Sequence, residues 1–125
     1  MLEVLIVGIG GFIGANLRFA LTKIIPNINF PYATLVANVV AAVVIGFILG
    51  LNNTSYDIKP RTRLLINTGI LGGLSTFSTF SLETINLFNE SRILDGILNI
   101  GLNLSLSLIG VLVGYSIAKI LVRNI

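Results

Sequence analysis

Long apolar stretches with almost no charge divide the chain into four segments. Residues 24–56, 64–82 and 96–118 contain no acidic or basic residue, and residues 4–22 contain only Arg18. A helix needs about 20 consecutive apolar residues to cross a hydrocarbon layer of about 30 Å. The pattern therefore predicts an all-α membrane protein whose helices span residues 2–23, 32–51, 63–88 and 95–121, within a single domain that covers residues 1–125.

The composition agrees with this prediction and excludes most soluble functions. Of the 125 residues, 54% are apolar and only 10% are charged, whereas soluble domains average about 25% charged residues. The chain has no cysteine and no histidine, which removes thiol chemistry and a histidine general base. No nucleophile–base pair or metal-ligand cluster points to an enzyme. The net charge of +3 is spread over connecting segments, without the basic stripe typical of nucleic-acid binding.

The basic residues of the connecting segments predict a weak preference for one orientation in the membrane. With the N-terminus in the cytoplasm, the inner side receives five basic residues and the outer side two, or three if Arg18 reaches the outer interface. This distribution favours cytoplasmic termini by a small margin. So small a margin permits insertion in both orientations. The inner residues are Lys59, Arg61, Arg63, Lys119 and Arg123, and the outer ones are Lys23 and Arg92.

Each predicted span contains two glycines four residues apart. Residues at this spacing share a helix face, and the missing side chains let another backbone approach closely. We interpret most of these glycines as helix-packing residues. Four small helices alone form little interior, so the pattern also favours an oligomer. The pairs are Gly10/Gly14, Gly46/Gly50, Gly69/Gly73 and Gly110/Gly114.

The third predicted span contains a sequence that forms helix poorly. Residues 69–81 read GILGGLSTFSTFS, in which adjacent glycines precede a run of serine and threonine. A helix break at membrane depth survives only where it is buried in protein or lines a cavity, and its freed carbonyl oxygens suit a hard cation such as Na⁺. The alternative is a continuous helix whose hydroxyls bond back to the preceding turn. The local hydroxyls are those of Ser75, Thr76, Ser78 and Thr79.

Aromatic and amide side chains are candidates for an anion path. Phe77 and Phe80 lie three residues apart on one helix face, and ring edges carry partial positive charge. Asn38 shares a face of the second span with Thr34. The fourth span carries a polar stripe at intervals of four, made of Asn99, Asn103 and Ser107. Uncharged donors can replace the water around a small anion without trapping it; the alternatives are core packing for the rings and interhelical hydrogen bonds for the amides.

Ionisable residues inside the spans are few, and this separates two classes of transporter. Arg18 lies near one end of the first span, where its side chain can reach the interface, line an anion-attracting vestibule or pair with an acidic residue such as Glu83. No carboxylate lies at the centre of a span, because Glu3 and Glu83 are near span ends. A proton-coupled exporter needs such a carboxylate, so we do not expect that activity.

Three blocks of the chain resemble the CrcB/Fluc family of bacterial fluoride channels. Residues 10–19 (GGFIGANLRF), residues 34–38 (TLVAN) and residues 69–80 (GILGGLSTFSTF) carry the likeness, and the last block is the most specific. The second block departs from the family pattern, since Ala33 replaces a glycine and Ala37 a valine. In the fourth span, Asn103 stands where the family often has an aromatic residue.

The resemblance implies a fluoride-specific channel that passively exports cytoplasmic fluoride and so reduces its toxicity. It implies an antiparallel, dual-topology homodimer in the bacterial inner membrane, in contact with lipid, with helix three broken mid-membrane and a structural Na⁺ at the dimer centre. The Na⁺ ligands map to the main-chain carbonyls of Gly72 and Ser75, and the pore residues to Asn38, Phe77, Phe80, Thr79 and Ser107. Arg18 maps to the family's arginine, with a structural or a vestibule role.

Two alternatives remain at this point. In the first, the chain is one half of an obligate heterodimer with a paralogous subunit, since some family members pair in this way. In the second, it is a non-conducting membrane assembly subunit whose polar residues only hold helices together. The residue spacing alone supports no more than a small-anion channel or a packed helix bundle.

Overall fold

The computed structural model describes residues 1–52 and 58–123, and within them every regular element is helical. A π-helix, η1, lies within the third of the predicted spans. The elements are α1 (Leu2–Ile24), α2 (Tyr32–Asn52), α3 (Pro60–Arg63), η1 (Leu64–Leu71), α4 (Gly72–Leu74), α5 (Phe77–Asn89) and α6 (Ile93–Arg123). The all-helical prediction is confirmed for these residues.

Three of the helices are long and apolar enough to cross a membrane, namely α1, α2 and α6. The predicted ranges 2–23, 32–51 and 95–121 lie within them. The remaining predicted span, 63–88, is divided among η1, α4, α5 and the end of α3, so no single helix in it reaches membrane length. Four helical segments therefore fit the four predicted spans, and one of the segments is interrupted.

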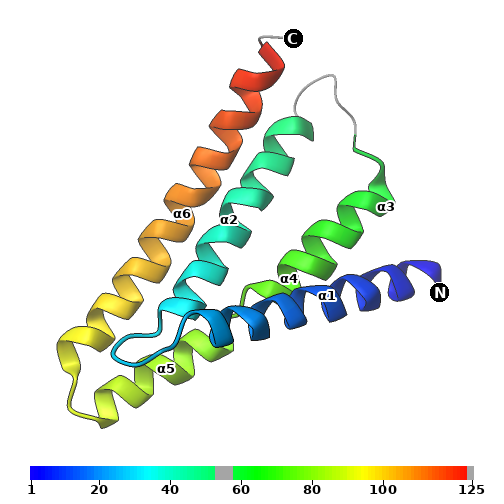
Figure 1. Cartoon of the computed structure of the whole chain (residues 1–125). Coiled ribbons are helices and arrows are strands. Elements are labelled where there is room, and N and C mark those ends of the chain that lie inside the picture. The colour runs from blue at the N-terminus through cyan, green and yellow to red at the C-terminus, as the bar shows by residue number, and fades with distance from the viewer. Residues whose placement is uncertain (53–57, 124–125) are drawn as a thin grey trace.

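The helices form two closely packed groups (Figure 1). Helices α2 and α6 lie side by side and run in the same direction, and α1 crosses the segment made of α3, η1 and α4. Helix α5 leaves this segment at an angle and leads to the turn before α6. Both chain ends lie away from the α1–α2 and α5–α6 connections.

Glycines make the close contacts within both groups. A β-carbon on Gly10 would lie 2.6 Å from the carbonyl oxygen of Leu65, and one on Gly73 would lie 2.7 Å from that of Gly11. In the other group, a β-carbon on Gly114 would collide with the carbonyl oxygen of Val43. The interpretation of the four-residue glycine spacing as helix packing is therefore confirmed at these positions.

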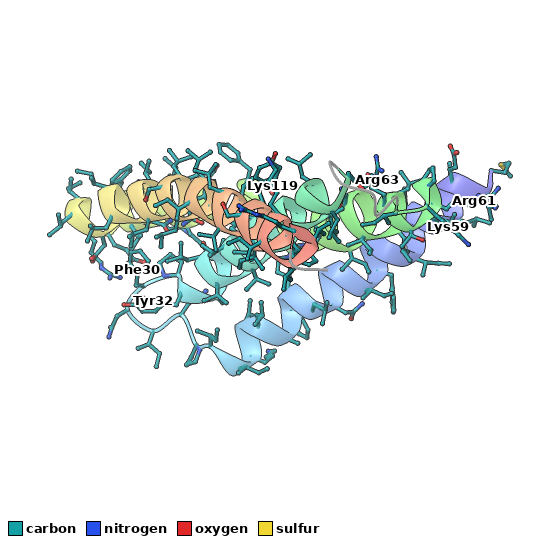
Figure 2. All side chains as sticks on the ribbon, turned by 90° about the horizontal axis from the view of Figure 1, so that it is seen from above. Phe30, Tyr32, Lys59, Arg61, Arg63 and Lys119 are labelled. Carbon is teal, nitrogen blue, oxygen red and sulfur yellow. The ribbon has the colours of Figure 1, made fainter. Side chains whose placement is uncertain are left out.

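Large apolar side chains cover much of the outer surface, including Phe12, Phe19 and Leu112. Exposed apolar surface on this scale belongs in lipid or against another protein. The basic side chains of Lys59, Arg61 and Arg63 gather at the opposite end from Phe30 and Tyr32 (Figure 2). This arrangement is the one that an apolar bundle with charged ends needs in a membrane.

Candidate functional site

A groove of about 490 Å³ opens on the surface where α2, α6 and the interrupted third segment meet. Six of the eight residues singled out from the sequence line it; Thr79 and Arg18 do not. We call this feature the central groove. Its lining residues are Asn38, Ala41, Ala42, Ile45, Asn67, Leu71, Gly72, Ser75, Thr76, Phe77, Phe80, Asn103, Leu104, Ser107, Leu108 and Val111.

The backbone of the third segment leaves the helical conformation between α4 and α5. Ser75 has φ −81° and ψ 149°, and Thr76 has φ −152° and ψ 123°, so both residues are extended. Ser75 still closes the preceding turn, because its N–H and its hydroxyl both donate to the carbonyl oxygen of Leu71 at 2.9 Å. Helix α5 then begins anew at Phe77 with Thr76 as its N-cap. Residues 69–81 therefore do not form one continuous helix.

Two side chains accept hydrogen bonds from the backbone of this interruption. The main-chain N–H of Thr76 donates to Asn38 Oδ1 at 2.9 Å. The main-chain N–H of Thr79 donates to the hydroxyl of Thr76 at 3.3 Å, which is the usual N-cap bond at the start of a helix. The Thr76 hydroxyl in turn donates to Thr79 Oγ1 at 3.2 Å. Thr79 thus supports the start of α5 from outside the groove.

Phe77 and Phe80 lie against each other with ring centroids 5.4 Å apart and planes tilted by 59°. Their exposures differ sharply, since Phe77 is 74% exposed and Phe80 only 7%. Tilted rings present an edge of one to the face of the other, which is a favourable aromatic arrangement. Phe80 is therefore fixed in the interior, while Phe77 presents most of its ring to whatever covers the groove.

A chain of amide hydrogen bonds joins the interruption to α6 and back to α5. Asn38 Nδ2 donates to Asn103 Oδ1 at 2.9 Å, Asn103 Nδ2 donates to Asn99 Oδ1 at 2.9 Å, and Asn99 Nδ2 donates to the Thr84 hydroxyl at 2.9 Å. The Thr84 hydroxyl ends the chain on the carbonyl oxygen of Phe80 at 2.8 Å. Because Asn99 and Asn103 are 0% and 5% exposed, their amides serve as interhelical bonds, the alternative left open by the sequence.

The other sequence candidates lie at different positions around this network. Ser107 is half-buried on the wall of the central groove. Arg18 is half-buried on α1, away from the groove. Glu83, its suggested acidic partner, accepts a hydrogen bond from the Thr34 hydroxyl at 2.7 Å instead.

Sequence reasoning did not identify Asn67 or the Thr34–Glu83 pair as parts of a site. Asn67 lines the central groove, and its Oδ1 is buried without a hydrogen-bond partner among the described residues. Its main-chain oxygen accepts from Gly72, five residues on, which places both on one face of the π-helix. An α-helical spacing rule does not find this relationship. The Thr34–Glu83 pair had a usable signal, since Thr34 shares a face with Asn38 and Glu83 follows Phe80 by three residues.

Comparison with known proteins gives the family. Residues 5–115 match the sequence profile described as "CrcB-like protein, Camphor Resistance (CrcB)". A protein of Clostridium novyi (strain NT) named fluoride-specific ion channel FluC is 52% identical over 119 residues, covering 93% of each chain. Proteins of the same name from Clostridium perfringens (strain ATCC 13124) and Methanococcus aeolicus are 47% and 41% identical, each over 124 residues. They cover 97% and 98% of this chain and 97% and 100% of their own length. The extent of these matches shows that the chain belongs to the CrcB family, the one indicated by its sequence blocks.

Proposed function

We propose that this protein is a fluoride-specific channel that lets cytoplasmic fluoride leave the cell down its electrochemical gradient, which lowers fluoride toxicity. The observation that carries the proposal is the meeting of Asn38, Phe77, Phe80 and Ser107 in one groove beside an interrupted helix. The curated relatives that match nearly the whole chain carry the fluoride-channel name. We place the protein in the cytoplasmic membrane of a bacterial cell, as a multi-pass protein with four spans.

The groove supplies what a small, strongly hydrated anion needs. Its polar groups are amides and hydroxyls without net charge, so they replace water around fluoride without holding the ion too tightly. Asn38 spends one N–H on Asn103 and retains a second, because a primary amide has two. The edges of Phe77 and Phe80 add partial positive charge along the path. The hydroxyl of Ser107 provides a further donor on the α6 wall, and Thr79 one at the start of α5.

Helix ends at the interruption support separate places for a cation and an anion. The helix that finishes at α4 turns its negative end toward the break, and α5, with 13 residues, turns its positive end toward the break. Discontinuous membrane helices use these two ends in this way, with anions at the N-terminal end and cations at freed carbonyls. Phe77 begins α5, so the fluoride path runs beside the positive end.

Gly72 and Ser75 fit a structural Na⁺. In a continuous helix their carbonyl oxygens would accept from the N–H groups of Thr76 and Thr79, which donate elsewhere here. Uncharged oxygen atoms freed in this way are suitable ligands for a hard cation. When bound, the ion supplies a fixed positive charge and a common ligand for the groups around it. Gly72 lies on the surface of α4 and Ser75 is half-buried, so both can contribute to a site shared with another subunit.

A second copy of the chain completes this site in our proposal. Two carbonyls are few for a cation that takes about six oxygen ligands, and a two-fold axis doubles the number. The exposed ring of Phe77 and the apolar wall of the groove provide a surface for the second copy, while lipid covers the outer faces. The small charge asymmetry between the two ends is compatible with an antiparallel, dual-topology homodimer. A heterodimer with a paralogous subunit uses the same surface.

The test is fluoride efflux from liposomes that contain this purified chain alone, followed with a fluoride electrode and repeated with chloride. Rapid release of fluoride without release of chloride supports a selective channel that needs no second gene product. Absence of both signals, with the protein folded and inserted, contradicts the homodimeric channel. Co-expression with a paralogous subunit then separates an obligate heterodimer, which conducts, from a non-conducting assembly subunit, which does not.

A further inference from the structure

We propose that Asn38 and Thr76 are positioning residues for the cation, because they take up the two N–H groups that would otherwise close the helix over the carbonyls of Gly72 and Ser75. This inference rests on the proposed function, since it concerns the structural Na⁺. It adds a role for Asn38 beyond the fluoride path and assigns one to the Thr76 hydroxyl.

Asn38 acts on the carbonyl of Gly72. A continuous helix would bond the N–H of Thr76 to this carbonyl, four residues earlier. That N–H donates to Asn38 Oδ1 at 2.9 Å instead. The amide of Asn38 is held in this orientation because its nitrogen donates to Asn103 Oδ1 at 2.9 Å. The oxygen end of Asn38 is thereby directed at the backbone of the interruption.

Thr76 acts on the carbonyl of Ser75. The N–H of Thr79, which a continuous helix would bond to this carbonyl, donates to Thr76 Oγ1 at 3.3 Å. The hydroxyl hydrogen of Thr76 is directed to Thr79 Oγ1 at 3.2 Å, which leaves a lone pair on Thr76 Oγ1 for the N–H. The ψ of 149° at Ser75 turns its carbonyl away from the helical direction, and the N-cap bond keeps α5 from starting one residue earlier.

Both acceptors therefore prevent the backbone from repairing the break. Without the Thr76 hydroxyl, the N–H of Thr79 has the Ser75 carbonyl as its nearest backbone acceptor, and the helical bond competes with the cation for that oxygen. The carbonyl would also turn toward the axis of α5. The cation then binds more weakly even where the fold is retained.

The experiment measures thermal unfolding of the purified full-length protein against Na⁺ concentration, with choline chloride holding the total salt constant. We expect Thr76→Val to raise the Na⁺ concentration that gives half of the maximal stabilisation by about tenfold, the equivalent of roughly one hydrogen bond. Thr76→Ser keeps the hydroxyl and should stay within about twofold of the unmodified protein. Ser81→Ala is the matched control, because its hydroxyl bonds back to the Phe77 carbonyl within α5.

A merely structural role for Thr76 would lower the melting temperature equally at all Na⁺ concentrations and leave the half-maximal concentration unchanged. That result overturns the inference. Absence of any Na⁺-specific stabilisation in the unmodified protein overturns the structural Na⁺ of the proposed function instead. If Thr76→Val does not fold, Asn38→Asp and Asn38→Leu give the same comparison. The carboxylate still accepts the Thr76 N–H, so only the leucine variant should lose sensitivity to Na⁺; equal losses in both contradict the inference.

Discussion

Asn38 Oδ1 lies 2.9 Å from the main-chain nitrogen of Thr76, 38 residues further along the chain. This bond joins α2 to the interruption of the third segment. The same amide lines the central groove and donates to Asn103 on α6. One side chain thus connects the proposed fluoride path, the freed carbonyls and the longest helix, so changes at any of the three should be felt at the others.

Phe77→Ile should reduce fluoride efflux at least about tenfold while leaving the melting temperature within a few degrees. The ring is 74% exposed, so little buried area is lost, but the aromatic edge that faces the path disappears. Liposome efflux and thermal unfolding are the two measurements. Phe12→Ile is the control, because Phe12 is 72% exposed on α1, away from the groove. Equal efflux by the Phe77 variant would remove this ring from the path.

Gly114→Ala should destabilise the protein by about 1–3 kcal/mol, because the added methyl group collides with the carbonyl oxygen of Val43 and forces α2 and α6 apart. Chemical or thermal unfolding in a mild detergent measures the effect. The matched control is Gly101→Ala on the same helix, where nothing lies within 4 Å of an added β-carbon. A control variant as unstable as Gly114→Ala would mean that helix propensity or a partner subunit, rather than this contact, sets the cost.

Asn99→Leu should cost about 1–2 kcal/mol, although leucine is more apolar and similar in size. The change removes a fully buried amide and leaves Asn103 Nδ2 and the Thr84 hydroxyl without their present partners. A double-mutant cycle with Thr84→Val measures the coupling. Additive effects of the two changes would show that the bond between them contributes nothing to stability. Asn86→Leu, at an exposed position on α5, is the surface control.

The orientation of the chain should respond to small changes in loop charge. The protein has no cysteine, so Asn89→Cys provides a single reactive site near the α5–α6 turn. In the proposed dual-topology protein, a membrane-impermeant thiol reagent labels about half of this site from each side. Adding two lysines to the segment around Lys59 should shift labelling to one side and reduce efflux by the homodimer. Labelling from one side only in the starting protein contradicts dual topology.

The sequence predicted the packing of this fold better than its local irregularities. The glycine pairs indicated the close contacts of Gly10 and Gly114, because a missing side chain has the same meaning in any helix. The polar stripe on α6 indicated buried partners, but its spacing did not distinguish bonds between helices from donors to an ion. That distinction depends on which element packs against Asn99, and Thr84 is distant in the pattern though not in space. Asn67 escaped because π-helical spacing looks ordinary in the sequence.

The π-helix η1 makes the groove sensitive to length as well as to chemistry. Within Leu64–Leu71 the main-chain bonds reach one residue further than in an α-helix, so this stretch accommodates one more residue than an α-helical path of the same course. Deleting a single residue there would let the segment relax to ordinary helix. Every side chain beyond it would then rotate by about 100° relative to α3. Gly72 and Ser75 would turn away from Asn38, so substitutions should be tolerated in η1 far more readily than a change in its number of residues.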